Sequence, residues 1–139
     1  MKHTIFFLTL TALLIIAGCN GCKVKMGCKV TFTDGTPLGV GEVYFQTPTY
    51  EARGILKPDG TYVVGSISDK DGLPKGKYNV YIFGAQKPDG KTEDGMNVKM
   101  VSLIDEKYLS PETSGITVDV PVSGGKFDIT VEPNPKTKK

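Results

Sequence analysis

The stretch from residue 59 to residue 83 constrains the fold of this chain more than any other. Asp59-Gly60 is a turn dipeptide, because glycine accepts the positive φ angle that a tight turn demands. Tyr62 and Val64 then alternate with smaller or polar residues, and after a second turn Tyr78, Val80 and Ile82 fall on the face opposite Lys77 and Asn79. This period of two is typical of a half-buried strand. We therefore expect two in-register strands here that form one half of a β-sandwich core.

The same alternation predicts strands along most of the remaining chain, at residues 26–33, 40–46, 50–56, 116–122 and 126–132. The last two are expected to form a hairpin through Ser123-Gly124-Gly125. The segment 85–114 is irregular and is expected to hold at most an edge strand or strap at 97–104. About seven strands at this spacing indicate an all-β sandwich. Its expected core residues share an inward parity: Val30, Phe32, Val43, Phe45, Tyr62, Val64, Tyr78, Val80, Ile82, Ile116, Val118, Phe127 and Ile129.

The first eighteen residues have the features of a secretory signal. Lys2 and His3 give a positively charged start, and residues 5–16 form a nearly uninterrupted apolar run. That run is short for a bilayer span, which takes about 20 residues. It ends in Ala17-Gly18-Cys19, and small residues followed by Cys resemble the lipobox of bacterial lipoproteins. The alternative is an ordinary secreted protein in which this Cys occurs by chance.

The lipobox resemblance implies that the signal is cut between Gly18 and Cys19, and that Cys19 carries a diacylglyceryl group and an N-linked acyl chain such as palmitate. The protein would then be held at a membrane through this lipid. Asn20 favours the outer membrane over the inner membrane, because Asp at this position tends to retain lipoproteins at the inner membrane. The expected organisation is a signal peptide at 1–18, the lipidated Cys and a tether at 19–25, the sandwich at 26–132 and a disordered basic tail at 133–139.

Cysteine, histidine and charge limit the chemistry of the mature chain. Cys22 and Cys28 could pair in an oxidising compartment. Alternatively, Cys28 shares a face with Val30 and is a small buried hydrophobe. The only His lies in the signal, and zinc usually takes about four Cys or His ligands, so neither a metal nor another cofactor is expected. The formal charge of +2 falls to +1 without Lys2, which gives no indication of a nucleic-acid partner.

Several turn and strand motifs, taken in order, resemble a carboxypeptidase regulatory-like, or transthyretin-like, domain. The motifs cover nearly the whole mature chain, and their end resembles small lipoproteins of planctomycete type that carry this domain. The resemblance implies a seven-stranded antiparallel Greek-key sandwich of the prealbumin type, and it implies no known catalytic or binding site. The residues that carry it are Gly27, Val30, Asp34-Gly35, Pro37-Leu38, Gly41, Val43, Phe45, Asp59-Gly60-x-Tyr62, Leu73-Pro74-x-Gly76-x-Tyr78-x-Val80, the segment 108–118 and Phe127-Asp128-Ile129.

Two possible chemical sites lack the residues they would need. Asp69-x-Asp71-Gly72 resembles half of a calcium loop, but a full loop takes about six oxygen ligands, so a solvated turn is expected. Some transthyretin-like proteins resemble hydrolases of an oxidised purine that rely on His and Arg. Here the only His is His3 and the only Arg is Arg53. A Ser nucleophile would also lack its His base. The chain is therefore not expected to be an enzyme.

Four aromatic residues, Tyr44, Tyr81, Phe83 and Tyr108, could form an exposed surface on which sugars or peptides stack. The alternative is that each covers the outer face of its own strand, because single exposed aromatic residues are ordinary. Clustering in one patch would favour an anchored, non-catalytic module that binds an envelope protein or a carbohydrate. Scattered aromatic residues would favour a purely structural component of the envelope or a lattice.

Overall fold

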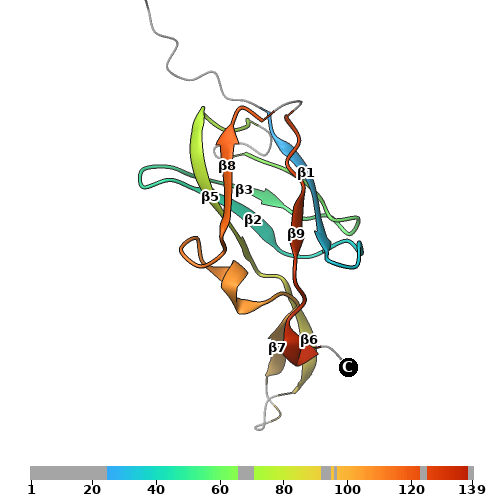
Figure 1. Ribbon diagram of the computed structural model, residues 1–139. Coiled ribbons are helices and arrows are strands. Elements are labelled where there is room, and N and C mark those ends of the chain that lie inside the picture. The colour runs from blue at the N-terminus through green and yellow to red at the C-terminus, as the bar shows by residue number, and fades with distance from the viewer. Residues whose placement is uncertain (1–24, 66–70, 92–94, 96, 123–124, 138–139) are drawn as a thin grey trace, which may run out of the picture.

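The computed structural model describes residues 25–65, 71–91, 95, 97–122 and 125–137, and these residues are mostly β-structure (Figure 1). Helical structure within them is limited to short 3-10 turns. The elements in chain order are β1 (Gly27–Phe32), β2 (Glu42–Gln46), β3 (Glu51–Ile55), β4 (Thr61–Val63), β5 (Gly76–Phe83), β6 (Gln86–Lys91), β7 (Val98–Ser102), η1 (Glu106–Leu109), β8 (Ile116–Val120), β9 (Ile129–Val131) and η3 (Pro135–Thr137).

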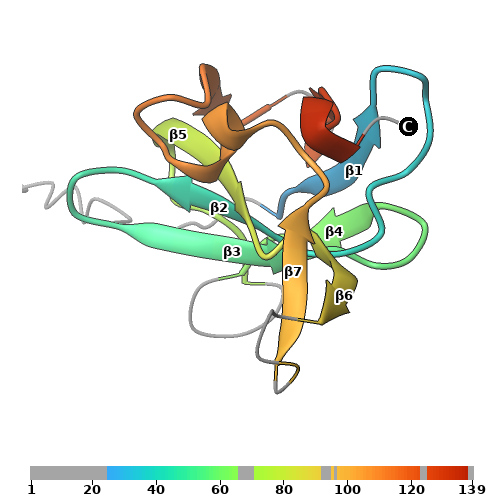
Figure 2. The ribbon, with the colours of Figure 1, turned by 90° about the horizontal axis from the view of Figure 1, so that it is seen from below.

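Two sheets face each other across the core. One has the strand order β3-β2-β5-β8 and the other has the order β4-β1-β9. Figure 1 shows β2, β3, β5 and β8 on one side of the molecule, with β1 and β9 on the other, and Figure 2 shows β2, β3 and β5 to the left of β1 and β4. The rings of Phe45 on β2 and Tyr62 on β4 meet with their centroids 6.1 Å apart. The all-β architecture expected from the sequence is therefore confirmed.

The pairing of the strands differs from the sequence-based expectation in three places. The strands β4 and β5 belong to different sheets, so they do not form one half of the core as a pair. The expected hairpin of the last two strands is also absent, because β8 pairs with β5 while β9 pairs with β1. The β1–β9 pair is parallel, so an entirely antiparallel sandwich is wrong. Alternation determines which face of a strand is buried, but it does not determine the neighbouring strand.

The core contains most of the residues that the alternation placed on the inner faces of the strands. Phe32, Ile116 and Phe127 are only partly buried and pack against it, whereas the other ten expected residues are buried. Four further buried side chains come from outside the predicted strands: Leu38, Leu73, Ala85 and Tyr108. Their burial shows that loops close the ends of the sandwich.

The segment after β5 forms a separate two-stranded unit. Strands β6 and β7 pair with each other in antiparallel register, with an irregularity between Pro88 and Lys91. Strand β7 lies within the predicted 97–104 strand, whereas β6 was expected to be irregular. Figure 1 shows this hairpin projecting below the sandwich, at the end opposite the start of β1.

Residues 133–137, which belong to the tail expected to be disordered, contact the rest of the described domain. Pro133 forms a bridge with Ile104. The side chain of Asn134 is buried, and its backbone N–H donates to the carbonyl oxygen of Leu103 at 2.9 Å. Lys136 Nζ lies 3.1 Å from Glu106 Oε1. These contacts fix the tail beside η1.

Candidate functional site

The outer face of the four-stranded sheet brings together three of the four predicted aromatic residues. Tyr44 on β2 lies opposite Tyr81 on β5, and Phe83 lies opposite Glu42. Because successive side chains point to opposite faces of a strand, these four residues share the outer face, while the intervening Val43 and Ile82 are buried. We call the surface formed by Glu42, Tyr44, Glu51, Arg53, Tyr81 and Phe83 the aromatic face.

The rings of Tyr44 and Tyr81 are stacked at the centre of this face. Their centroids are 4.9 Å apart, and their planes differ by 16°. Such aromatic pairs contribute about 0.5–1.5 kcal/mol beyond the area they bury. Phe83, one step further along β5, remains 61% exposed. The aromatic residues therefore form one patch rather than isolated side chains.

Carboxylates fix both tyrosine hydroxyls. The Tyr44 hydroxyl donates to Glu42 Oε2 at 2.6 Å, and Arg53 Nη1 lies 3.1 Å from the same oxygen. The Tyr81 hydroxyl donates to Glu51 Oε2 at 3.1 Å. These bonds hold the two rings in place. The tyrosine side chains would therefore lose little conformational entropy when a ligand binds against them.

The environment raises the pKa of both phenols above the ordinary value of about 10. Burial raises the pKa of Tyr81 to about 12, and the charge of Glu51 and its hydrogen bond act in the same direction. The hydrogen bond to Glu42 raises the pKa of Tyr44. Both groups therefore remain hydrogen-bond donors over the physiological range, and neither is a nucleophile there.

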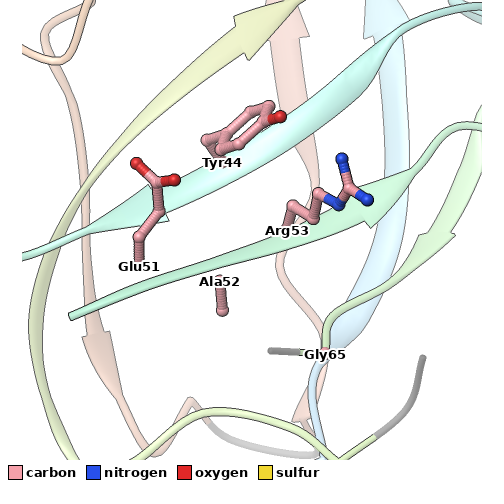
Figure 3. Close-up of a pocket in the computed structure, with 5 residues that line it drawn as sticks. All are labelled: Tyr44, Glu51, Ala52, Arg53 and Gly65. Carbon is pink, nitrogen blue, oxygen red and sulfur yellow. The ribbon is translucent and has the colours of Figure 1, made fainter. Parts of the chain in front are cut away.

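Two open hollows adjoin the ring of Tyr44. The first has a volume of about 320 Å³ and is lined by Tyr44, Glu51, Ala52, Arg53 and Gly65. Figure 3 shows Glu51 and Arg53 projecting from β3 on either side of it, with Tyr44 behind them on β2. The second has a volume of about 600 Å³. Its lining residues are Gly39, Val40, Gly41, Glu42, Tyr44, Arg53, Ile55, Leu56, Phe83 and Gly84.

Tyr108 does not belong to the aromatic face, so its expected place on an exposed surface is wrong. Its side chain is 7% exposed and belongs to the core cluster. Its hydroxyl accepts a hydrogen bond from the backbone N–H of Glu132 at 3.4 Å. Tyr108 lies in the 3-10 turn η1, where the two-residue alternation of strands does not indicate which side chains are buried.

One of the three cysteines lies within the described residues, and the other two lie outside them. Cys28 is half-buried on β1, and its hydrogen bond to Asp128 raises the pKa of the thiol. Cys19 and Cys22 lie outside the described residues. Lipidation at Cys19 and a Cys22–Cys28 disulfide therefore stay predictions.

The described residues do not gather three or more His, Cys, Asp or Glu side chains in a way that could hold a metal ion. Of the carboxylates in the calcium-like motif, Asp69 lies outside the described residues. A search of the same described part of the chain finds no helix that is both long and apolar enough to cross a membrane.

The charged partners of the aromatic residues were not predicted from the sequence. Glu42 lies two residues before Tyr44 on β2, and Glu51 and Arg53 lie two residues apart on β3. Their spacing alone would place each pair on one face of its strand. What the spacing could not supply is the β2–β3 register, in which Tyr44 lies opposite Arg53.

Comparison with known proteins adds no further assignment. No family model, curated protein or solved structure matches the chain.

Proposed function

We propose that this protein is a non-catalytic, lipid-anchored module of the bacterial cell envelope that binds a protein or a carbohydrate through the aromatic face. One observation carries the binding function: Tyr44, Tyr81 and Phe83 gather in a single patch with hydrogen-bonding groups around it. The pattern that ends in Ala17-Gly18-Cys19 supports the anchor, and Asn20 favours the outer membrane.

The chemistry of the aromatic face suits recognition of a ligand. Binding sites usually combine apolar and aromatic walls with a few polar groups that fix orientation. Here the stacked tyrosines and Phe83 supply the apolar surface, while Glu51 and Arg53 supply an acceptor and a donor on opposite sides of a hollow. Aromatic residues and Arg are also the side chains most enriched at sites of strong binding.

The proposal also includes a more specific fold than an all-β sandwich. A seven-stranded Greek-key sandwich of the transthyretin type is supported by the division of seven strands into sheets of four and three. The order and spacing of the turn motifs around Asp34-Gly35 and Asp59-Gly60 also support it.

A purely structural role in the envelope or a lattice is the alternative function. The β6–β7 hairpin favours this role, because Val98 and Met100 on β7 are exposed apolar residues on a two-stranded unit outside both sheets of the sandwich. Exposed apolar surface of this kind is a common feature of protein contacts.

A pull-down from envelope extract tests the proposed function. The full-length chain, purified from membranes in detergent, is immobilised and compared with the Tyr44→Ser/Tyr81→Ser double variant, and glycan binding is measured in parallel. The control is Val63→Ser, because Val63 is an exposed residue on β4 of the opposite sheet. We expect the double variant to lose the captured protein or glycan and the control to keep it. Equal capture by all three proteins would remove the aromatic face from the proposal.

A further inference from the structure

The charges of the aromatic face are not balanced. Arg53 pairs with Glu42 at 3.1 Å, and within the described residues no cation forms an ion pair with Glu51. Glu112 adds negative charge nearby, since the charges of Glu51 and Glu112 both raise the pKa of Tyr81. The carboxylate that accepts from the Tyr81 hydroxyl therefore has no ion-pair partner among the described residues, which favours a cation over an anion or a neutral group at this position.

Glu51 retains the capacity to accept a further hydrogen bond. The Tyr81 hydroxyl and Gln46 Nε2 both donate to Glu51 Oε2, at 3.1 Å and 3.3 Å. Among the described residues, Oε1 of the same carboxylate receives no such bond. A guanidinium or ammonium group that binds Oε1 would lie beside the stacked tyrosines, where the aromatic rings also attract cations.

The second hollow lies one step along β5 from Tyr81, beside Phe83, and the Glu42–Arg53 ion pair forms part of its wall. Val40, Ile55 and Phe83 are exposed there by 41%, 57% and 61%. Tyr81 and Phe83 are two residues apart on β5, which corresponds to about 7 Å along a strand. A partner segment in extended conformation repeats this spacing between its own residues i and i+2.

We infer that the aromatic face binds an extended segment of a partner protein that carries a Lys or Arg side chain and, two residues away, an apolar side chain. The cation contacts Glu51 and the Tyr44–Tyr81 stack, and the apolar side chain packs against Val40, Ile55 and Phe83 in the second hollow. This inference rests on the proposed function and selects a protein rather than a carbohydrate as the partner.

A peptide titration tests the charge and the apolar position together. The probes are capped hexapeptides of the form Gly-x-Ser-z-Ser-Gly, in which x is Leu, Val, Phe or Ser and z is Arg, Lys, Ser or Glu. The full-length chain in detergent is titrated with each peptide by calorimetry, and a neutral cello-oligosaccharide is titrated in parallel. We expect peptides with an apolar x and a basic z to bind about fivefold more tightly than those with Glu at z.

Two variants, each of which removes one negative charge from the outer face of the same sheet, test whether the basic side chain of the peptide binds at Glu51. Glu51→Gln should weaken binding of the Arg peptide about threefold, and it should also reduce the sensitivity of that binding to salt. Asp119→Asn should leave binding unchanged, because Asp119 on β8 is exposed on the outer face but lies opposite Lys77, four residues from Tyr81 along β5.

The outcomes separate this inference from the proposed function. If peptides with Glu at z bind as well as those with Arg, or if Glu51→Gln has no effect, the inference is wrong. If only the oligosaccharide binds, and the Tyr44→Ser/Tyr81→Ser variant loses it, the inference is wrong while the proposed function stands. If the peptides and the oligosaccharide fail to bind and the pull-down is also negative, both are wrong.

Discussion

The properties of Tyr81 depend on several of its neighbours. Its ring stacks on Tyr44, and its hydroxyl donates to Glu51. Burial and the nearby carboxylates disfavour the charged phenolate, so the pKa of Tyr81 is raised to about 12. The contacts that orient the ring therefore also link the ionisation of this phenol to folding.

This linkage predicts a loss of stability at high pH. A phenol whose folded-state pKa lies above its unfolded value of about 10 contributes stability that is fully present below pH 10. That contribution is lost as the pH rises through the folded-state pKa of about 12. The midpoint of urea unfolding should therefore fall between pH 10 and 12, and it should fall less in Tyr81→Phe. Identical pH dependence in the two proteins would contradict the environment described for Tyr81.

At the scale of the elements, the alternation of side chains predicted where strands form and which face of each is buried. It predicted less well which strands pair with each other. Residues 42–46 and 77–83 were correctly divided into inner and outer side chains. The parallel pairing of β1 with β9 depends on contacts between residues about one hundred positions apart, such as Val30 and Ile129, and no local pattern records such a contact.

The candidate site shows the same division between local and long-range information. The outward positions of Tyr44, Tyr81 and Phe83 follow from local alternation. Their gathering in one patch follows from the β2–β5 register, which the sequence did not reveal. Strand β6 was missed for a local reason, since Pro88 and Gly90 are typical of loops and, within sheets, Pro is largely confined to edge strands.

The packing of β2 against the opposite sheet predicts unequal effects of two phenylalanine substitutions. Phe45 is fully buried, whereas Phe127 is only partly buried and meets Phe45 edge-on with a centroid distance of 6.4 Å. Phe45→Ala should lower the free energy of unfolding by about 3–5 kcal/mol. Phe127→Ala should cost less, because it removes less buried apolar surface. Urea unfolding of the two variants measures this difference, and unchanged midpoints in both would remove the core assignment.

At the scale of the whole molecule, the described chain begins at one end of the sandwich and the β6–β7 hairpin projects from the other (Figure 1). An anchor at Cys19 would precede the first described residue by six positions. The start of β1 would then lie nearer to the lipid surface than the hairpin does. Strands β2 and β5, which carry the aromatic face, lie between these two ends.

The lipid anchor predicts the fractionation behaviour of the protein. One acyl chain gives only marginal membrane binding, whereas two or more hold a protein stably. Wild-type protein should therefore sediment with membranes of the native host, and Cys19→Ser should move it to the soluble fraction or leave it unprocessed. Cys28→Ser is the matched control and should leave the fractionation unchanged. Soluble wild-type protein, or an intact mass with an unmodified Cys19, would contradict the anchor.

Photo-crosslinking in cells tests the central claim, that the aromatic face is the surface that meets the partner. Benzoylphenylalanine is introduced into the full-length chain in place of Phe83 or, as the control, in place of Val63. Both side chains are exposed, but they lie on strands of opposite sheets. We predict a discrete adduct, with a protein or a glycan, from position 83 and none from position 63. No adduct from position 83, or equal adducts from both positions, would contradict the account.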